Sequence, residues 1–468
     1  MTDNDAAIID EVVQKARIAQ QAYEAMGSQE LFDDACAAVG WALMEPGRNA
    51  ELAELAVAET GLGNVADKIK KNHNKTLGLL RDLQGARSTG HIHDDIEKGL
   101  SVYYRPKGVI AAIVPSTNPL ATPVNNIINA LKTGNAIIIA PSPKGVKPGV
   151  KLLGYIHAHL RKLGLPDDLV QMVPSPPSKA KTERLMQIAD LVVVTGSQNN
   201  VRAGYRSGTP AIGVGAGNVV TIIDETADIS GAAEKIAASK TFDNATSCSS
   251  ENSVIAISSV YEDVCQRLQE QGGLILTEEE GVRLRDTHWH HGKMTGKLLA
   301  KDIEVMVKEL GLEGRADADT RFLVLPQDDI DKESPLTSEK MSRFLTLYRA
   351  DDFEDATRKA VEIQSVLGAG HSLGVHTSED SRAHALAMQA QSCRIIVNQA
   401  HCFATGGFFN NGMPFSLSMG CGSWGKNSID ENLNWTHFIN KVNVVRVIPE
   451  NKPELADMFS SYWEKYGK

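Results

Sequence analysis

The chain has 468 residues, of which 42% are hydrophobic and 23% are charged, a composition typical of a folded protein with two to three domains. The formal net charge of −10 argues against a nucleic-acid-binding protein, which would need clustered cations to neutralise phosphates. Six cysteines without a CxxC pair indicate reduced thiols in a reducing compartment rather than a disulfide framework.

The first predicted elements are amphipathic helices over residues 4–84. Ile8, Val12, Val13 and Ala16 illustrate their apolar stripe. Such helices could bind a partner, but a layer that covers a sheet is the favoured interpretation.

The N-terminus lacks the basic and apolar regions of a secretory signal, and the apolar runs of the chain are too short to span a bilayer. We therefore expect a cytoplasmic protein without a membrane partner.

From about residue 101, short apolar runs alternate with helical stretches. The predicted strands lie at 109–114, 136–140, 169–173, 191–194 and 219–223, and the predicted helices lie at 119–131, 146–163, 179–188 and 199–206. This alternation predicts βαβ units and a parallel, doubly wound sheet. A second α/β segment follows to about residue 419, with strands predicted at 253–257, 322–325, 344–348 and 395–398.

Cys248 is the first candidate catalytic residue. It lies in a polar loop, Phe-Asp-Asn-Ala-Thr-Ser-Cys-Ser-Ser-Glu-Asn, which follows a predicted helix. A cysteine among small polar residues on a loop suits a nucleophile better than a core position. Upstream, Gly213, Gly215 and Gly217 alternate, which predicts positive φ angles and a backbone close to a ligand.

Asn118 is the second candidate. It follows the predicted strand at 109–114 in the sequence Val-Pro-Ser-Thr-Asn-Pro, where a helix begins. Its amide could donate a hydrogen bond to an oxyanion that develops during a reaction. An N-cap of the following helix is an equally good interpretation.

Four segments together resemble the coenzyme A-acylating branch of the aldehyde dehydrogenase family. They are Pro-Ser-Thr-Asn-Pro at 115–119, Ala-Ile-Gly-Val-Gly-Ala-Gly-Asn at 211–218, Ser-Lys-Thr-Phe-Asp-Asn-Ala-Thr-Ser-Cys at 239–248, and Gly-Cys-Gly-Ser-Trp-Gly-Lys-Asn-Ser at 420–428. Their order and approximate spacing match that family from about residue 101 to 445.

The resemblance implies an aldehyde dehydrogenase-like α/β fold with a Rossmann-type dinucleotide-binding domain and a second α/β catalytic domain. The expected boundaries are 1–215 for the dinucleotide-binding domain with its helical layer and 216–424 for the catalytic domain. Residues 425–468 are expected to return to the first domain or to form an oligomer interface. A homodimer or homotetramer is expected from the same resemblance.

The resemblance also implies roles for individual residues. Cys248 falls at the catalytic cysteine, and Asn118 at the asparagine that binds the oxyanion together with the N–H of Cys248. NAD(P) is the expected cofactor and coenzyme A the expected co-substrate. The residues implied to contact the dinucleotide are Pro115, Ser116, Ser142, Lys144, Thr195, Gly196, Ser197, Gly215 and Glu339.

Two departures refine this expectation. Hydrolytic members of the family carry a glutamate where this chain has Val214, and valine cannot serve as a general base. A thioester at Cys248 should therefore persist until the thiol of coenzyme A attacks it. Beyond the strand at 136–140, Pro143 occupies the place of a carboxylate common in NAD-preferring members, with Lys144 and Lys147 nearby. NADP should thus be tolerated, unless both lysines are merely solvated.

The chain is most similar in its motifs to acylating sulfoacetaldehyde dehydrogenases, which makes sulfoacetaldehyde the expected substrate, with acetaldehyde and succinate semialdehyde as alternatives. Arg343 stands where related enzymes usually have proline, and it could bind an anionic substrate tail or be structural.

Two other functions stay open. One is a hydrolytic dehydrogenase with Glu251 as a surrogate base, and the other is a catalytically silent scaffold. The histidines at 288–291 and at 91 and 93 match no closed zinc site, so no metal is expected.

Overall fold

A computed structural model describes residues 3–468. Its N-terminal helices form the predicted helical layer: α1 (Asp3–Met26), α2 (Gln29–Met44), α3 (Pro46–Thr60) and α4 (Val65–Leu83). Apolar residues of α1 to α4, such as Phe32 and Leu52, belong to one buried cluster with the first sheet. In the described part of the chain, no helix combines the length and the apolar character that crossing a membrane requires.

The first sheet has five parallel strands in the order β5-β4-β3-β6-β7. Their bounds are β3 (Val109–Ile113), β4 (Ala136–Ala140), β5 (Val170–Met172), β6 (Leu191–Val194) and β7 (Ala211–Gly213). Helices connect them: α5 (Ala121–Lys132), α6 (Val146–Leu160), α7 (Lys179–Ile188) and α8 (Gln198–Arg206). β3, β4 and β6 are wholly buried, as expected for continuous apolar runs.

The chain order reverses at β3, because the next strand along the chain lies on one side and β6 lies on the other. Parallel sheets of this kind bind ligands at such a switch point, beyond the carboxyl ends of the strands. The segment with Asn118 follows β3, and the Thr195-Gly196-Ser197 turn follows β6. The topology therefore brings two predicted site segments to one edge.

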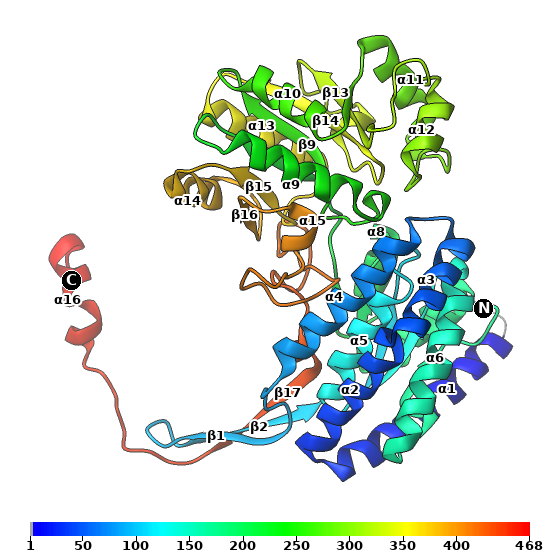
Figure 1. Cartoon of the computed structure of the whole chain (residues 1–468). Coiled ribbons are helices and arrows are strands. Elements are labelled where there is room, and N and C mark those ends of the chain that lie inside the picture. The colour runs from blue at the N-terminus through cyan, green and yellow to red at the C-terminus, as the bar shows by residue number, and fades with distance from the viewer. Residues whose placement is uncertain (1–2) are drawn as a thin grey trace.

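The second sheet has seven parallel strands in the order β10-β13-β14-β9-β8-β15-β16. Their bounds are β8 (Val219–Ile223), β9 (Glu251–Ile257), β10 (Gly273–Ile275), β13 (Phe322–Gln327), β14 (Phe344–Ala350), β15 (Leu373–His376) and β16 (Ile395–Val397). The accompanying helices are α9 (Ile229–Thr241), α10 (Tyr261–Glu270), α11 (Glu278–His288), α12 (Ile303–Leu310), α13 (Phe353–Val366), α14 (Asp380–Gln389) and α15 (His401–Ala404). Two further short strands, β11 (Trp289–His290) and β12 (Lys293–Met294), pair with each other. Figure 1 shows this lobe above the helical layer of the first.

One predicted strand changes sheets. We placed residues 219–223 after the four strands of the first series, although the expected boundary at 215/216 assigns them to the catalytic domain. They form β8, which pairs with β9 and β15 in the second sheet. The fifth strand of the first sheet is β7 instead. Its three residues end in Gly213 within a glycine-rich stretch, so its sequence carries too little strand pattern to be recognised.

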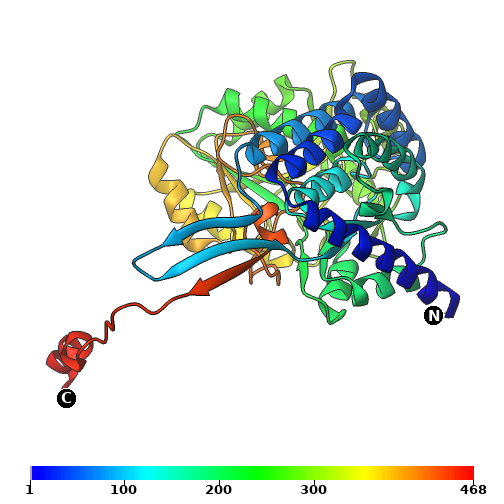
Figure 2. The same cartoon turned by 90° about the horizontal axis from the view of Figure 1, so that it is seen from below.

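A third, antiparallel sheet projects from the first lobe as an arm. It consists of β1 (Gly90–Asp95), β2 (Leu100–Pro106) and β17 (Ile439–Val445), in that order. Figures 1 and 2 show the chain running on from β17 to α16 (Leu455–Tyr466), which stands apart from the other elements. Pairing of β17 with β2 returns the C-terminal segment to the part of the chain that precedes the first sheet.

Candidate active site

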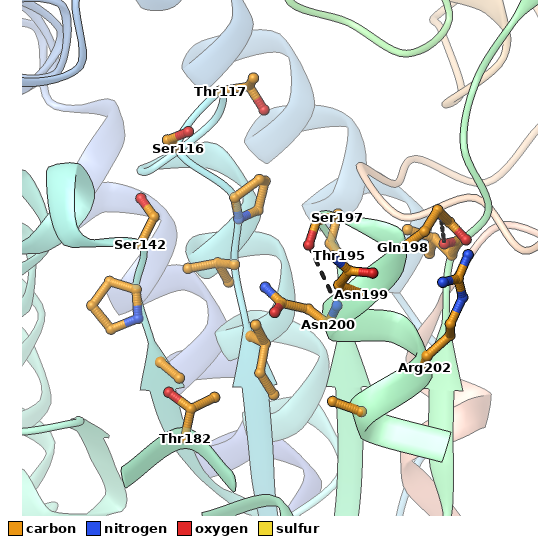
Figure 3. A pocket seen from close by; sticks show the side chains of 18 of the residues that line it. Ser116, Thr117, Ser142, Thr182, Thr195, Ser197, Gln198, Asn199, Asn200 and Arg202 are labelled. Carbon is orange, nitrogen blue, oxygen red and sulfur yellow. Dashed lines mark hydrogen bonds between the residues drawn. The ribbon is translucent and has the colours of Figure 1, made fainter. Parts of the chain in front are cut away.

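A cleft of about 1120 Å³ lies at the carboxyl ends of the first sheet. One wall comes from the segments that follow β3, β4 and β6, and from α7 and α8 (Figure 3). The opposite wall comes from the second sheet, and it includes Gly215, Cys248 and Glu339. These residues precede β8, β9 and β14, which are neighbouring parallel strands. Because the amino ends of neighbouring parallel strands share an edge, residues far apart in the chain meet at the cleft.

Cys248 is half-buried and lies where two cavities meet. It lines the large cleft and also a small chamber of about 60 Å³. The turn before it is left-handed at three consecutive non-glycine residues, Asp243, Asn244 and Ala245, with φ angles of 49°, 53° and 57°. Such residues cost about 1–2 kcal/mol each in this conformation, so the surrounding structure must hold them.

Buried ionic contacts hold this turn. The carboxylate of Asp243 accepts from Nζ of Lys71 at 2.5 Å and from Nζ of Lys68 at 3.1 Å, and its other oxygen accepts from the N–H of Asn64 at 3.0 Å. Burial alone would raise the pKa of Asp243, but the charges of Lys71 and Lys68 outweigh it and hold that pKa below its ordinary value. α4 thus fixes the segment that leads to Cys248.

Asn118 is tied to the same cluster. Nζ of Lys71 donates to the side-chain oxygen of Asn118 at 2.9 Å. The amide NH₂ of Asn118 is then left to donate elsewhere, and Asn118 lines both cavities together with Cys248. The N-cap interpretation is wrong, because α5 begins at Ala121 after Leu120, which makes no side-chain cap bond. The structure therefore favours the hydrogen-bond donor interpretation.

His371 was not identified from the sequence. Its Nε2 lies 3.3 Å from Sγ of Cys248, its Nδ1 lies 2.7 Å from Oγ of Ser372, and that hydroxyl lies 2.8 Å from Nε2 of His401. His371 lies two residues before β15 (Leu373–His376), which is short and follows glycines, so no strand was predicted there. Its role is indicated only by its place in the folded sheet, at the amino end of a strand that lies beside β8.

Residues 1–437 match the aldehyde dehydrogenase family. The chain belongs to that family. It is 50% identical to a sulfoacetaldehyde dehydrogenase (acylating) of Cupriavidus necator over 98% of this chain and 92% of the relative. Among solved structures, an acetylating aldehyde dehydrogenase of Geobacillus thermoglucosidasius is 31% identical with a TM-score of 0.91, covering 97% of this chain and all of that one (100%).

A third relative bears on the chemistry of the family. The structure of a propionaldehyde dehydrogenase of Rhodopseudomonas palustris, with bound CoA and an acylated cysteine, has a TM-score of 0.83 and 26% identity to this chain. The two structures align over 94% of this chain and 97% of the relative. The expected aldehyde dehydrogenase-like α/β fold and the assignment to an oxidoreductase family are confirmed.

The electrostatics of the site favour neutral groups. Burial raises the pKa of the Cys248 thiol to about 12, with a further contribution from the charge of Glu339. Burial also lowers the pKa of His371 to about 3, and the charge of Arg394 adds to this. At neutral pH the pair is therefore a thiol beside a neutral imidazole, whose unprotonated nitrogen can accept a hydrogen bond from the thiol.

The wall of the cleft beside the first sheet has features that suit a dinucleotide. The hydroxyl of Ser142 lines the cleft and is buried without a hydrogen-bond partner among the described residues. A Cβ atom added to Gly196 would meet nothing within 4 Å, so the turn after β6 faces open space. Ser197 caps α8 by accepting from the N–H of Asn200 at 3.4 Å. A helix start, an open turn and an unpaired hydroxyl suit a pyrophosphate group.

The glycines of the turn at 213–217 act differently from our prediction. None of Gly213, Gly215 and Gly217 has a positive φ angle. A Cβ atom on Gly217 would instead lie 2.0 Å from the backbone oxygen of Cys248, and one on Gly215 would lie 2.5 Å from Sγ of Cys421. Gly217 therefore permits close packing of the Cys248 loop against the turn before β8, and Gly215 permits close packing of the segment that carries Cys421.

Most of the remaining predicted residues line the cleft: Pro115, Ser116, Thr195 and Glu339. Lys144 does not line it, and its Nζ donates to the carbonyl oxygen of Thr60 at 3.4 Å. Lys147 pairs with Glu59 at 2.7 Å. The cleft is lined instead by three cations that we did not single out: Lys179, Arg202 and Arg206. Figure 3 shows Arg202 on α8.

Two further candidates lie outside both cavities. Arg343 lines neither the cleft nor the chamber, and its Nε is buried without a hydrogen-bond partner among the described residues. Glu251 is fully buried at the start of β9, where its Oε1 accepts from the N–H of His401. The structure does not bring either residue together with Cys248. Within residues 3–468, no group of three or more His, Cys, Asp or Glu side chains is arranged to hold a metal ion.

Proposed function

We propose that this chain oxidises an aldehyde through a thioester on Cys248, with NAD(P) as the electron acceptor and coenzyme A as the acyl acceptor. The observation that carries the proposal is the position of Cys248 at the junction of the two cavities, with Nε2 of His371 at 3.3 Å from its sulfur. The large cleft has room for a dinucleotide, and the small chamber has room for the substituent of a short aldehyde.

The residues around Cys248 supply acid–base and electrostatic catalysis. His371 takes the proton of the thiol as the sulfur attacks the aldehyde carbon. The oxyanion that forms accepts hydrogen bonds from the amide of Asn118 and from the backbone N–H of Cys248. One such donor contributes about 3 kcal/mol of transition-state stabilisation. Lys71 keeps the oxygen of the Asn118 amide engaged, which leaves its NH₂ free to donate to the oxyanion.

The residues of the cleft suit the cofactor, which supplies a two-electron acceptor when it is bound. Ser142, Thr195, Gly196 and Ser197 would hold the pyrophosphate, and Glu339 would bind the ribose of the nicotinamide. Lys144 and Lys147, the lysines after β4, do not line the cleft, which agrees with the alternative that they are solvated. The positively charged side chains of Arg202 and Arg206 line the cleft, and both NAD and NADP are compatible with them.

Acyl transfer is favoured over hydrolysis by what surrounds the thioester. Val214 lines the cleft where hydrolytic members carry a glutamate, and it is 7% exposed. Glu251, the alternative base, is buried away from the cavities. Thiol exchange with coenzyme A leaves one thioester for another, so the step is close to reversible. The printed names of the acylating relatives agree with this proposal.

Sulfoacetaldehyde is the proposed substrate, since the relative with 50% identity is named for it. Acetaldehyde and succinate semialdehyde are the alternatives. We also propose a cytoplasmic enzyme, in line with six cysteines that are all free.

A homo-oligomer is proposed from the arm and from α16. Both expose apolar side chains: Val442, Val444, Val445, Leu455, Met458, Phe459 and Tyr462. Such a surface on an extended segment favours a protein interface. The domain boundaries at 215/216 and 424/425 remain predictions.

The test is an assay of NAD(P)H formation with several aldehydes, each dinucleotide, and coenzyme A present or absent. Turnover that requires coenzyme A and yields an acyl-CoA is expected. Cys248→Ser should abolish it. Equal turnover without coenzyme A would instead indicate the hydrolytic enzyme, and inactivity with every aldehyde would favour a scaffold.

A further inference from the structure

The small chamber behind Cys248 has an unusual lining. Its wall is largely apolar and aromatic, contributed by Phe242, Phe403, Phe408, Phe415, Leu417 and Met419. Lys71, Lys75 and Ser249 add polar groups to it. About 10–15 Å³ of such a cavity holds one water molecule. The chamber of about 60 Å³ therefore has room for a small group of roughly five non-hydrogen atoms.

Lys75, on α4, is the cation of this chamber that has no carboxylate partner. Its Nζ donates to the carbonyl oxygens of Gly406 and Gly407, both at 2.8 Å, and lies 5.4 Å from the centre of the Phe415 ring. No carboxylate of the described residues lies within 4.0 Å of it. An ammonium group has three N–H donors, so one remains for a ligand.

Neighbouring charges do not neutralise Lys75. The Asp82 carboxylate is engaged with the N–H of Phe415 at 2.7 Å and with Arg81 at 2.9 Å. Lys71 differs, because its ammonium is bound to Asp243. A partly buried cation without a counter-ion is costly unless an anion binds beside it. In agreement, burial lowers the pKa of Lys75 to about 8, although the charge of Cys402 opposes this effect.

Ser249 provides a second, independent feature. Its side-chain hydroxyl is buried and has no hydrogen-bond partner among the described residues, and the residue is 1% exposed. It lines the same chamber as Lys75 and follows Cys248 directly. A buried hydroxyl without a partner indicates a donor that awaits a ligand oxygen.

We propose that Lys75 is the residue that selects an anionic aldehyde, by donating a hydrogen bond from Nζ to the sulfonate of the substrate, with Ser249 as an auxiliary donor. This inference rests on the proposed function, since the aldehyde carbon must lie at Cys248. In sulfoacetaldehyde the part beyond the carbonyl is one CH₂ group and one sulfonate, which together contain five non-hydrogen atoms and match the size of the chamber. Lys75 takes the role that the sequence had suggested for Arg343.

The test compares kcat/KM for sulfoacetaldehyde and for the neutral propionaldehyde, with coenzyme A and NAD(P), in the wild type and in Lys75→Met. Loss of a charge-assisted hydrogen bond should lower kcat/KM for sulfoacetaldehyde about 10- to 100-fold. The value for propionaldehyde should change by less than about threefold. Lys75→Gln keeps a donor for the Gly406 and Gly407 carbonyls and is used alongside, in case the methionine disturbs that loop.

Lys70→Met is the matched control, because Lys70 lies on the same helix, is exposed to solvent and does not line the chamber, although its Nζ lies 5.9 Å from the centre of the Phe403 ring. It should leave both aldehydes nearly unchanged. If Lys75→Gln lowers kcat/KM equally for both aldehydes, or if Lys70→Met lowers it for sulfoacetaldehyde as much as Lys75→Met does, the proposed contact is wrong.

A binding experiment separates this inference from the proposed function. Ethanesulfonate carries the sulfonate without the aldehyde, so it can bind whether or not the chain turns over. It should raise the Tm of the wild type and leave that of Lys75→Gln unchanged, with dimethyl sulfone as the neutral control. No rise in the wild type would contradict the anion site. Absence of coenzyme A-dependent turnover with every aldehyde would contradict only the proposed function.

Discussion

Nε2 of His371 lies 3.3 Å from Sγ of Cys248, although 123 positions separate the two residues in the chain. The loops that carry them precede β15 and β9, which both flank β8 in the second sheet. Because all three strands are parallel, their amino ends meet at one edge, and this edge faces the cleft. The sheet topology thus brings the proposed nucleophile beside the proposed base.

The first prediction concerns proton transfer in this pair. Since the pKa of Cys248 is about 12 and that of His371 is about 3, the thiolate fraction is small at neutral pH. Alkylation of Cys248 by iodoacetamide should therefore accelerate with rising pH and show no plateau up to about pH 9. A plateau near pH 7 would show instead that the free thiol is already activated.

The variant His371→Ala should lower kcat by about 10²- to 10⁴-fold, the usual contribution of a positioned general base. Its burst of NAD(P)H in stopped-flow measurements should slow by a similar factor. His384→Ala is a suitable control, because His384 is an exposed residue on α14. A normal burst rate in His371→Ala would exclude this histidine as the base.

The second prediction concerns the oxyanion. Asn118→Ala removes the amide donor and should lower kcat by about 10²- to 10³-fold with a small effect on KM. Lys71→Met leaves the amide in place but removes the 2.9 Å contact that orients it, so its effect on kcat should be smaller. If Lys71→Met raises KM and leaves kcat unchanged, Lys71 does not position Asn118.

The order of the main strands followed from apolar runs, because strands buried on both faces carry few polar residues. Predicted strands at 136–140, 191–194 and 219–223 agree in their bounds with β4, β6 and β8. Cys248 and Asn118 were found because each stands in a polar loop beside such a run. The apolar pattern does not reveal which strands pair with β8, so residues 219–223 were grouped with the first series of strands although the boundary expected from the family resemblance put them in the catalytic domain.

Other parts of the site depend on long-range contacts that no local pattern encodes. His371 lies beside a strand of four residues, and its role appears only when β15 lies against β8. The left-handed turn at Asp243 requires two lysines from α4, which are more than 170 positions away in the chain. Lys75 is one lysine in a helix rich in them, and only its contacts distinguish it.

The third prediction concerns stability. Asp243→Asn leaves the ammonium groups of Lys68 and Lys71 buried without a counter-ion, which should lower the free energy of unfolding by about 3–5 kcal/mol. Asp263→Asn is the control, because that residue makes an exposed i,i+4 contact with Arg267, and it should change stability by less than about 1 kcal/mol. Urea denaturation monitored by circular dichroism measures both values.

The ionisation of Asp243 also predicts how the stability of the protein changes with pH. The pKa of Asp243 is below its ordinary value in the folded chain, so its stabilising contribution is present above the unfolded pKa of about 3.9 and is lost as the pH falls further. The stability difference between wild type and Asp243→Asn should therefore shrink at acid pH. A difference that grows below pH 4 would contradict the ionised carboxylate.

The fourth prediction concerns the fate of the thioester. Val214→Glu places a carboxylate in the cleft at the position where hydrolytic members of the family have one. It should allow turnover without coenzyme A, which the wild type should lack, because the carboxylate can activate water. Val214→Gln is the matched control without a base. Free acid formed equally by both variants would show that the added carboxylate does not act as the base.

The last prediction uses the titration of Lys75 to separate anionic from neutral substrates. Burial lowers the pKa of Lys75 to about 8, and the groups that act on its charge are Cys402 and Lys71, with Asp82 contributing less. A lysine is charged below its pKa, so an anionic aldehyde should bind well below pH 8 and progressively worse above it. KM for sulfoacetaldehyde should therefore rise between pH 7 and pH 9.5, whereas KM for propionaldehyde should stay nearly constant.

The variants complete this argument, because acid–base steps at Cys248 and His371 affect both aldehydes alike. The ratio of the two kcat/KM values removes these shared steps and leaves the ionisation of Lys75. In the wild type this ratio should fall by about tenfold for each pH unit well above the pKa. In Lys75→Gln it should be low and independent of pH, because the side chain has no charge to lose. A wild-type ratio that does not change with pH would show that the Lys75 charge does not contribute to substrate selection.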